Sequence, residues 1–514
     1  MPALQAEKRS MRFTRNSGIL LHPTSLPGPF GSGDLGASSY HFIDWLSKAG
    51  QSLWQMLPMG PIGLANSPYM SFSAFAGNPI LIDLYELVDC GWLTKNELDY
   101  TQDKSRNCIN YLEVIPYRIN ILQMASEGFF KQGNLESQKQ YKTYCSTEQS
   151  WLDDYALFQA LNYKYDGEEW TNWDHDIAKR DSNALKKASQ ELREHVELYK
   201  FAQWCFDRQW KKLKSYAQAH DIKLVGDIPI FVSQHSADVW SHPEMFDLDE
   251  NGVPNVIAGV PPDYFSETGQ RWGNPLYRWD IMKQDDYRWW IHRFRRTFEM
   301  FDILRIDHFR GFESYWEIPE KEETAKIGRW IKAPGLDFFK TVKAELGTLP
   351  IIAEDLGIMT PEVNALREKL HFPGMKVLQF AFADGPENAF LPHQYEKNCV
   401  VYTGTHDNDT TCGWYEKATE HERDFVRRYC KTDGHEINWD LIKLALQSSA
   451  DMAVIPFQDV IGLGSEGRMN FPGTIEGNWE WRFTWEQVGP APADRLYELT
   501  ALYGRYNPDR LNLL

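Results

Sequence analysis

The chain has 514 residues, of which 42% are hydrophobic and 25% charged, and its formal net charge is −18. This acidic balance argues against a nucleic-acid backbone or an anionic membrane as partner, because both favour a basic face, and it is compatible with a neutral substrate. The 20 Trp, 24 Tyr and 28 Phe residues hint at carbohydrate, since flat rings stack on sugars, although large core side chains account for most of them.

Short apolar runs bounded by Gly, Pro and Asp recur along the chain, and each predicts a buried parallel strand because its apolar residues are continuous rather than alternating. In chain order they are 18–22, 52–57, 223–226, 303–306, 350–353, 376–380, 400–403 and 452–456. Most are separated by stretches long enough for a helix, such as 360–370 and 421–430. Eight such units predict an α/β fold, a (β/α)8 TIM barrel with large insertions, and a single catalytic unit over 1–514.

Two gaps between the predicted strands are too long for a plain strand–helix unit. Residues 85–218 contain amphipathic segments rich in Lys, Glu and Gln, which predict a mainly helical insertion after the second strand. Residues 228–285 are rich in Pro, Gly, Asn and aromatics and show little periodicity. A loop of that length inside a compact domain is usually functional or disordered, and its aromatic content favours an ordered loop that covers the active site.

Two short motifs are decoys. The GxGxxG match at 462–467 would have to open a helix to bind a dinucleotide, yet a Pro-Gly pair follows at 472–473, so we expect a glycine loop at the barrel mouth. The Asp/Asn pattern at 247–252 resembles a calcium loop, but Ala258 stands where that loop needs a Glu, and a turn explains it better. We therefore expect no metal site.

Four predicted strands end in carboxylates: Asp227, Asp307, Glu354 and Asp407. The carboxyl ends of barrel strands converge on one cavity, so these distant acids are expected to be neighbours. Any one of them could simply cap the next helix. Four together, with Arg and His beside them, favour a functional site, because crowded carboxylates repel one another and raise their pKa values.

Cleavage of a glycosidic bond needs one ionised carboxylate and one protonated carboxylic acid. Arg305 lies two residues before Asp307, so both side chains share a strand face and the guanidinium is expected to hold Asp307 ionised, as a nucleophile requires. Glu354 follows an apolar strand without a basic neighbour, which favours a raised pKa and the role of general acid. If the pair acts by retention, its carboxyl groups should lie about 5–5.5 Å apart.

Asp407 is expected to bind sugar hydroxyls and to help distort the ring, with His406 and His308 as further hydrogen-bond partners.

These residues also carry a family resemblance. The groups Arg305-x-Asp307-His308, Glu354-Asp355 and His406-Asp407 resemble the carboxylate motifs of the α-amylase clan. Further segments narrow the match: GILLHPTSLP (18–27), SPY (67–69), SFSAFAGNP (71–79), GDIPIFV (226–232), GVPPDYFSETGQRWGNP (259–275) and PGTxxxNWxWR (472–482). Over nearly its whole length the chain resembles the amylomaltase family (4-α-glucanotransferase, or disproportionating enzyme; glycoside hydrolase family 77).

The resemblance implies roles for individual residues. Asp307 would be the nucleophile, Glu354 the acid/base and Asp407 the transition-state stabiliser, in agreement with the physical argument. The sugar at the bond to be cut would be lined by Tyr69, Asp227, Arg305, His308 and His406. A lid over the acceptor side would contain Tyr264, Phe265, Ser266, Gln270, Trp272 and Asn274. For Tyr264 and Phe265 a small core within the loop is the alternative.

The predicted activity is transfer of a segment of an α-1,4-glucan to the 4-hydroxyl of glucose or of another glucan, by a retaining double displacement. Malto-oligosaccharides, amylose and glucose, derived from starch or glycogen, would be donors or acceptors, and no cofactor is needed. The nearest alternative is an α-1,4-glucan hydrolase on the same barrel. A non-catalytic glucan-binding protein would be expected to have lost one of the acids, yet all are present.

The seven cysteines are scattered, odd in number and without a CxxC spacing, which favours a reducing compartment. No run of eighteen apolar residues and no signal-peptide pattern is found, so we expect a soluble, cytoplasmic protein that binds no membrane. A short organelle-targeting remnant at the N-terminus is the alternative.

Overall fold

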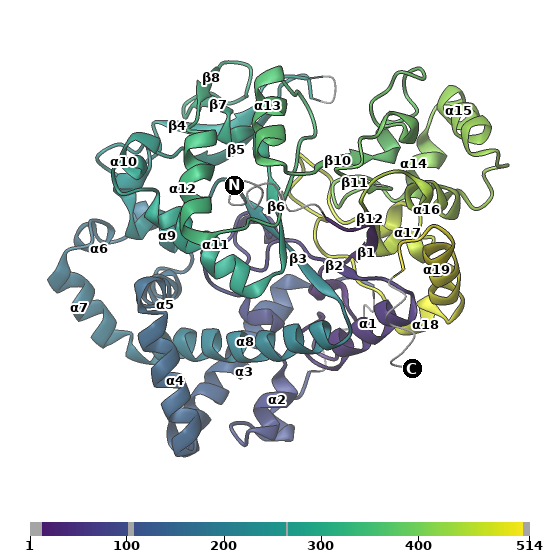
Figure 1. The fold of residues 1–514 in the computed structure, drawn as a ribbon. Coiled ribbons are helices and arrows are strands. Elements are labelled where there is room, and N and C mark those ends of the chain that lie inside the picture. The colour runs from purple at the N-terminus through teal and green to yellow at the C-terminus, as the bar shows by residue number, and fades with distance from the viewer. Residues whose placement is uncertain (1–12, 101–106, 264–265, 507–514) are drawn as a thin grey trace, which may run out of the picture.

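The computed structural model describes residues 13–100, 107–263 and 266–506. Within them, eight parallel strands form a nearly closed barrel in the order β10-β11-β12-β1-β2-β3-β6-β9 (Figure 1). The strands are β1 (Asn16–Leu20), β2 (Leu53–Gln55), β3 (Lys223–Pro229), β6 (Ile303–Asp307), β9 (Ile351–Ala353), β10 (Gly374–Val377), β11 (Cys399–Tyr402) and β12 (Met452–Pro456). At the seam the Ala353 N–H donates to the carbonyl of Pro373, just before β10, at 2.9 Å. The predicted barrel is confirmed.

The strands form where the apolar runs predicted them, because both faces of a barrel strand are covered and nearly every position is buried. The run 376–380 was extended too far, however. The ladder of β10 ends at Val377, and Leu378–Phe380 form a 3-10 helix. An apolar run shows burial but does not show where hydrogen bonding to the next strand stops.

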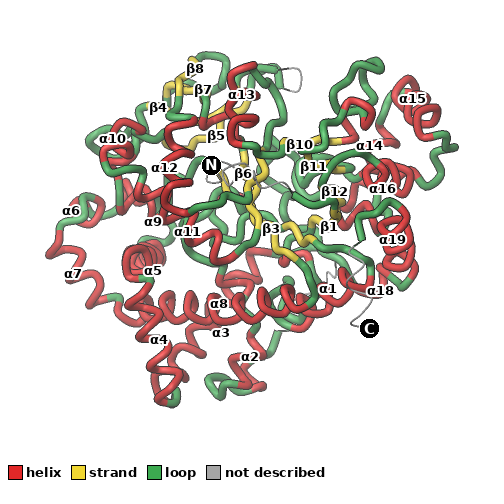
Figure 2. Tube along the Cα trace, in the orientation of Figure 1, coloured by secondary structure: helices red, strands yellow, loops and turns green. Residues whose placement is uncertain are grey.

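Between β2 and β3 the described chain is mainly helical (Figure 2). The helices are α2 (Leu84–Asp89), α3 (Tyr111–Gln132), α4 (Leu135–Thr147), α5 (Gln149–Lys164), α6 (His175–Ala178), α7 (Ser182–Glu191) and α8 (Arg193–Ala219). The long helix α8 packs against α3, α4 and α5 and also against α1 (Ala37–Lys48) of the barrel. The Gln203 side chain both accepts from the Gly77 N–H, at 2.8 Å, and donates to the Gly77 carbonyl, at 2.7 Å. This pair anchors the loop after β2 to the helices.

A second, antiparallel sheet has the strand order β5-β4-β7-β8. Its strands are β4 (Val256–Val260), β5 (Gln270–Pro275), β7 (Ser314–Pro319) and β8 (Arg329–Lys332). The segment 228–285 is therefore more regular than its sequence suggested, and it also contains α9 (Ala237–Ser241) and α10 (Trp279–Gln284). The alternation of apolar and polar residues in this segment is hard to see because a register shift interrupts the pairing of β4 with β5. In addition, the partner strands β7 and β8 follow β6 in the sequence and so lie outside the segment.

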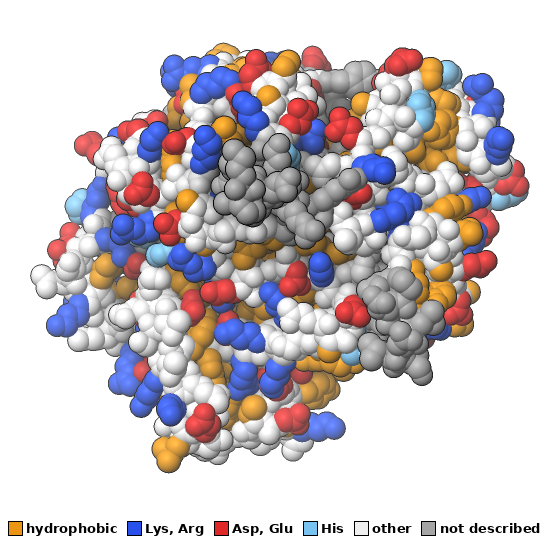
Figure 3. Space-filling view, viewed as in Figure 1, with side chains coloured by type: hydrophobic (Ala, Val, Ile, Leu, Met, Phe, Trp, Pro, Cys, Tyr) orange, Lys and Arg blue, Asp and Glu red, His pale blue; other side chains and the backbone are white. Residues whose placement is uncertain are grey.

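The remaining helices surround the barrel. They are α11 (Arg288–Met300), α12 (Leu336–Leu346), α13 (Pro361–Leu370), α14 (Thr411–Lys417), α15 (Glu420–Cys430), α16 (Ile437–Gln447), α17 (Phe457–Val460), α18 (Trp485–Val488) and α19 (Ala491–Leu502). Acidic and basic side chains are interspersed over the face seen in Figure 3. Among the described residues, no helix combines the length and apolar character needed to cross a bilayer.

The two decoys are turns. In the segment 247–252 the carboxylate of Asp249 accepts from the Asn251 N–H at 2.8 Å, and Gly252 follows with φ +85°, as in a β-turn. In the glycine loop only Ser465–Gly467 are helical, as one 3-10 turn, so no long helix opens there. The described residues hold no cluster of His, Cys, Asp and Glu suited to a metal ion.

Candidate active site

The four predicted acids lie at the carboxyl ends of barrel strands. Asp227 is in β3, Asp307 is the last residue of β6, Glu354 directly follows β9, and Asp407 lies in the loop after β11. Strands β6 and β9 are paired, with Ile306 opposite Ala353, so Asp307 and Glu354 are the next residues along that pair. The fold thus places the four acids at one end of the barrel.

Arg305 joins two of these acids. Its Nη1 donates to both carboxylate oxygens of Asp227, at 2.8 and 2.7 Å, and its Nη2 lies 3.1 Å from Asp307 Oδ1. The guanidinium is 95% buried and the Asp227 side chain is fully buried. Burial alone would lower the pKa of Arg305, but the carboxylates of Asp227 and Asp307 raise it well above its ordinary value. Arg305 is therefore a fixed positive charge between two strands.

A second group of contacts surrounds Tyr69, on the loop after β2. Its hydroxyl donates to Asp227 Oδ2 at 2.7 Å and lies 2.9 Å from His406 Nε2, while the two rings stack with centroids 5.2 Å apart. Because the only hydroxyl proton is directed to Asp227, His406 must donate from Nε2, which fixes its tautomer. Burial lowers the pKa of His406, so its imidazole is neutral.

Glu354 is held by the backbone. The His308 N–H donates to Oε2 and the Leu356 N–H donates to Oε1, both at 2.8 Å. Burial raises the pKa of Glu354, whereas Arg305 and the two N–H groups act in the opposite direction. Each oxygen of this acid therefore has one fixed donor.

The protonation of Asp307 differs from the sequence-based prediction. Its side chain keeps 30% of its surface exposed. Burial raises the pKa of Asp307 to about 8; Arg305 lowers it, but the nearby carboxylates of Asp227, Glu354 and Asp407 raise it further. Arg305 was expected to hold Asp307 ionised; it does lower the pKa of Asp307, but burial and the neighbouring carboxylates outweigh its effect. The pKa values of Asp307 and Glu354 are therefore both raised above their ordinary values.

Asp407 is placed by a loop that the sequence analysis set aside. Asn470 Nδ2 donates to Asp407 Oδ1 at 2.7 Å, and Arg468 Nη2 donates to the Asp407 carbonyl at 2.8 Å. His406 Nε2 lies 3.4 Å from the same Oδ1. Arg468 and Asn470 were missed because they sit just beyond the GxGxxG decoy. The position of that loop after the last barrel strand was the signal, since such loops border barrel sites.

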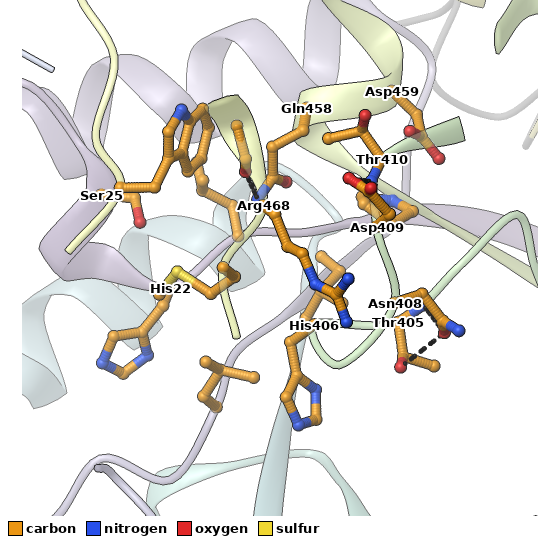
Figure 4. A pocket seen from close by; sticks show the side chains of 17 residues that line it. His22, Ser25, Thr405, His406, Asn408, Asp409, Thr410, Gln458, Asp459 and Arg468 are labelled. Carbon is orange, nitrogen blue, oxygen red and sulfur yellow. Dashed lines mark hydrogen bonds between the residues drawn. The ribbon is translucent and has the colours of Figure 1, made fainter. Parts of the chain in front are cut away.

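A pocket lies beside this loop and is lined by His22, Thr405, His406, Asp409 and Arg468, among others (Figure 4). The close view shows His22 and His406 on the same side of Arg468. Burial and His406 lower the pKa of His22 to about 3, so it is a neutral imidazole. Its place in the segment after β1 is a further feature that the strand-end argument overlooked.

The predicted lid residues are only partly brought to the site. Trp272 meets His308 edge-on with ring centroids 4.8 Å apart, and its Nε1 donates to Gln270 Oε1 at 3.0 Å. Asn274 is buried and donates to the Val232 carbonyl at 2.8 Å, so it links the lid strand to the loop after β3. Ser266 closes a turn by donating to the Gly269 carbonyl at 2.7 Å. Tyr264 and Phe265 lie outside the described residues.

Comparison with known proteins adds independent information. A family model described as 4-alpha-glucanotransferase matches residues 21–487. The chain is 49% identical to the 4-alpha-glucanotransferase of Thermus thermophilus, over 95% of this chain and 98% of that protein. It is 48% identical to the Synechocystis 4-alpha-glucanotransferase, over 96% and 98%.

A solved structure, the amylomaltase from Streptococcus agalactiae in complex with acarbose, is similar with a TM-score of 0.93 and 37% identity, covering 96% of this chain and 100% of that one. The amylomaltase from Corynebacterium glutamicum shares the fold, with a TM-score of 0.76 at 18% identity and coverage of 96% of this chain and 75% of that one.

Proposed function

Because the chain belongs to the 4-alpha-glucanotransferase family, we propose that its barrel site transfers a segment of an α-1,4-glucan to the 4-hydroxyl of glucose or of another glucan. The main support for this proposal is the pairing of β6 with β9, which puts Asp307 beside Glu354. Backbones of paired strands run about 4.8 Å apart, and this spacing supports the separation of about 5–5.5 Å that a retaining pair needs.

In the first step Asp307 Oδ attacks the anomeric carbon as Glu354 gives its proton to the departing glycosidic oxygen. The carbon–oxygen bond to the leaving sugar breaks and an ester to Asp307 forms. The first step needs one proton shared by this pair, and the raised pKa values of both acids favour its retention. Binding of the leaving sugar beside Glu354 favours the state in which that proton is on Glu354 and Asp307 is ionised.

In the second step the 4-hydroxyl of an acceptor sugar attacks the same carbon. Glu354, now ionised, takes the hydroxyl proton, the ester bond breaks and Asp307 is released as a carboxylate. Two inversions regenerate an α-1,4 bond. Glu354 therefore alternates between acid and base, and its two backbone donors suit the charged half of that cycle.

The residues around the pair bind the sugar. We assign Tyr69, Asp227, Arg305, His308 and His406 to the glucose at the cleaved bond. The hydrogen bonds that join Tyr69, Asp227, Arg305 and His406 support this assignment. Asp407, with 47% of its side chain exposed, is directed by Asn470 and would accept from sugar hydroxyls.

On the acceptor side we assign the predicted lid residues, Tyr264, Phe265, Ser266, Gln270, Trp272 and Asn274. The ring of Trp272 beside His308 supports this assignment. An aromatic lid that excludes water favours a sugar over water as the acceptor.

The donors we propose are malto-oligosaccharides and amylose. The test is incubation of the purified protein with maltotriose and chromatography of the products. A ladder of longer oligosaccharides plus glucose, with little increase in total reducing ends, is the expected result. A steady increase in reducing ends without longer products would identify a hydrolase instead.

We also propose that residues 85–218 and 228–285 are insertions into one catalytic unit, supported by the Gln203–Gly77 anchor and by the contact of Trp272 with His308. A cytoplasmic location is supported by the scattered positions of the seven cysteines, which show no CxxC spacing. Fractionation of cells producing the full chain tests that location.

A further inference from the structure

His308 has an unusual backbone. It follows the nucleophile position Asp307 and precedes the 3-10 helix η7 (Phe309–Phe312), and its φ and ψ are +51° and +49°, in the left-handed region. That region is disfavoured for residues with a Cβ and is most often occupied by glycine. Such strain persists only where the surroundings hold it in place, and it is frequent at functional sites.

The conformation determines which way two N–H groups point. In a strand successive N–H groups alternate in direction, whereas in either helical region they point the same way. At His308 both groups face one residue: the His308 N–H donates to Glu354 Oε2 at 2.8 Å, and the Phe309 N–H donates to the Glu354 carbonyl at 3.2 Å. The Glu354 N–H in turn donates to the Ile306 carbonyl at 3.0 Å.

The segment 306–309 thus holds both the main chain and the side chain of Glu354. An extended residue at 308 would turn one of the two N–H groups away. A right-handed residue would keep them parallel but would send the chain away from the path into η7. The left-handed conformation meets both requirements.

The imidazole of His308 does not account for this backbone. It is buried, its ring meets Trp272 edge-on at 4.8 Å, and burial lowers its pKa to about 3. These contacts involve only the side chain of His308, whereas the hydrogen bond to the Glu354 carboxyl is donated by its main-chain N–H.

We propose that His308 acts on the reaction through its main chain, as a positioning residue whose left-handed conformation keeps one N–H on the Glu354 carboxyl throughout the acid/base cycle. This role is separate from any contact of the imidazole with sugar, and it rests on the proposed function of Glu354 as acid/base. The consequence is greatest in the second step, where Glu354 must be ionised to take the acceptor's proton.

The test compares His308→Gly, His308→Ala and His308→Val. All three lose the imidazole alike, but their tolerance of the left-handed region falls from Gly to Ala to Val. Turnover is measured with α-maltosyl fluoride as donor and maltose as acceptor, because fluoride leaves with little help from an acid and the reaction then depends on the base step. Circular dichroism and thermal unfolding verify that each variant is folded.

We expect kcat to fall in the order Gly, Ala, Val, with a span of about tenfold or more, and with little change in KM for the donor. The limb of the pH profile of kcat/KM for the acceptor maltose that reports Glu354 should move to higher pH in the same order, because loss of the N–H bond disfavours the charged carboxylate. If His308→Val does not fold, the Gly and Ala pair decides the order. Equal turnover and superimposable pH profiles in the folded variants would overturn the proposal.

Glu354→Gln separates this proposal from the function it rests on. If that variant disproportionates maltotriose at the parent rate, the acid/base assignment fails. If it is inactive on maltotriose while the His308 variants show no order, only the positioning role fails.

Discussion

Arg305 Nη2 lies 3.1 Å from Asp307 Oδ1, and this ion pair is the direct link between the fixed cation of the site and its proposed nucleophile. The same guanidinium reaches both oxygens of Asp227 through Nη1. The guanidinium of Arg305 therefore places one positive charge against the carboxylates at the ends of two strands, β3 and β6.

Replacement of Arg305 tests that link. Arg305→Lys retains the charge but cannot span both carboxylates, because a single ammonium lacks the planar fork of the guanidinium. A hydrogen bond to a charged group contributes about 1.5–3 kcal/mol, so the loss of one such contact should lower kcat on maltotriose by about tenfold to a hundredfold. Arg193→Lys, at an exposed pair with Glu197 on α8, is the matched control and should be unchanged. Parent-like turnover in Arg305→Lys would contradict the assigned role.

The raised pKa of Asp307 predicts a pH-dependent cost to folding. Its ordinary value is 3.8 and its folded value is about 8, so between these values the folded state binds a proton that the unfolded state does not. Stability from this group is therefore lost as pH rises through that window. Asp307→Asn removes the charge, and its thermal stability relative to the parent should increase from pH 4 to pH 8. A constant difference in Tm between the variant and the parent across that range would show that folding does not raise the pKa of Asp307.

Asn470 should matter for turnover although the sequence did not single it out. Asn470→Ala removes the donor to Asp407 Oδ1, and a hydrogen bond to a charged group contributes about 1.5–3 kcal/mol, which corresponds to a loss in kcat of about tenfold to a hundredfold. Asn172→Ala, which removes an exposed amide–carboxylate contact with Glu168, serves as control. The measurement is the initial rate of disproportionation, and equal rates for both variants would remove Asn470 from the site.

Asp459 fixes the two ends of the loop that carries His406 and Asp407. Its buried carboxylate accepts from the Thr403 hydroxyl at 2.5 Å and from the N–H and hydroxyl of Thr411, each at 2.7 Å. Asp459→Asn turns an amide NH2 towards these donors, and a buried unsatisfied polar group costs about 1–3 kcal/mol. Denaturant unfolding should show that loss together with a lower kcat. An unchanged midpoint and rate would mean that the loop is held by other contacts.

The barrel could be predicted because its evidence is local. Continuous apolar runs mark strands buried on both faces, and an acid such as Glu354 directly after a run marks a strand end. The antiparallel sheet could not be predicted in the same way. Its strands β4 and β7 are neighbours in the sheet although β6 lies between them in the sequence, and a shift of register between β4 and β5 disrupts the alternation that would have revealed it.

The site was predictable as far as it depends on strand ends. His22, Arg468 and Asn470 lie in loops, and only the folded path of those loops brings them to the acids. The protonation of Asp307 was beyond sequence reasoning for a different reason. Its pKa depends on how many carboxylates share Arg305, and that number is a property of the assembled barrel end.

In the proposed mechanism Asp307 forms a covalent bond to the anomeric carbon while Glu354 donates and accepts the proton. The most direct measurement is mass spectrometry of Glu354→Gln after reaction with α-maltosyl fluoride, whose leaving group needs little protonation and whose ester then lacks a base for transfer. We expect a maltosyl ester on the peptide that contains Asp307, and no such ester in Asp307→Asn. A label on Asp227 or Asp407, or the same label in Asp307→Asn, would contradict this mechanism.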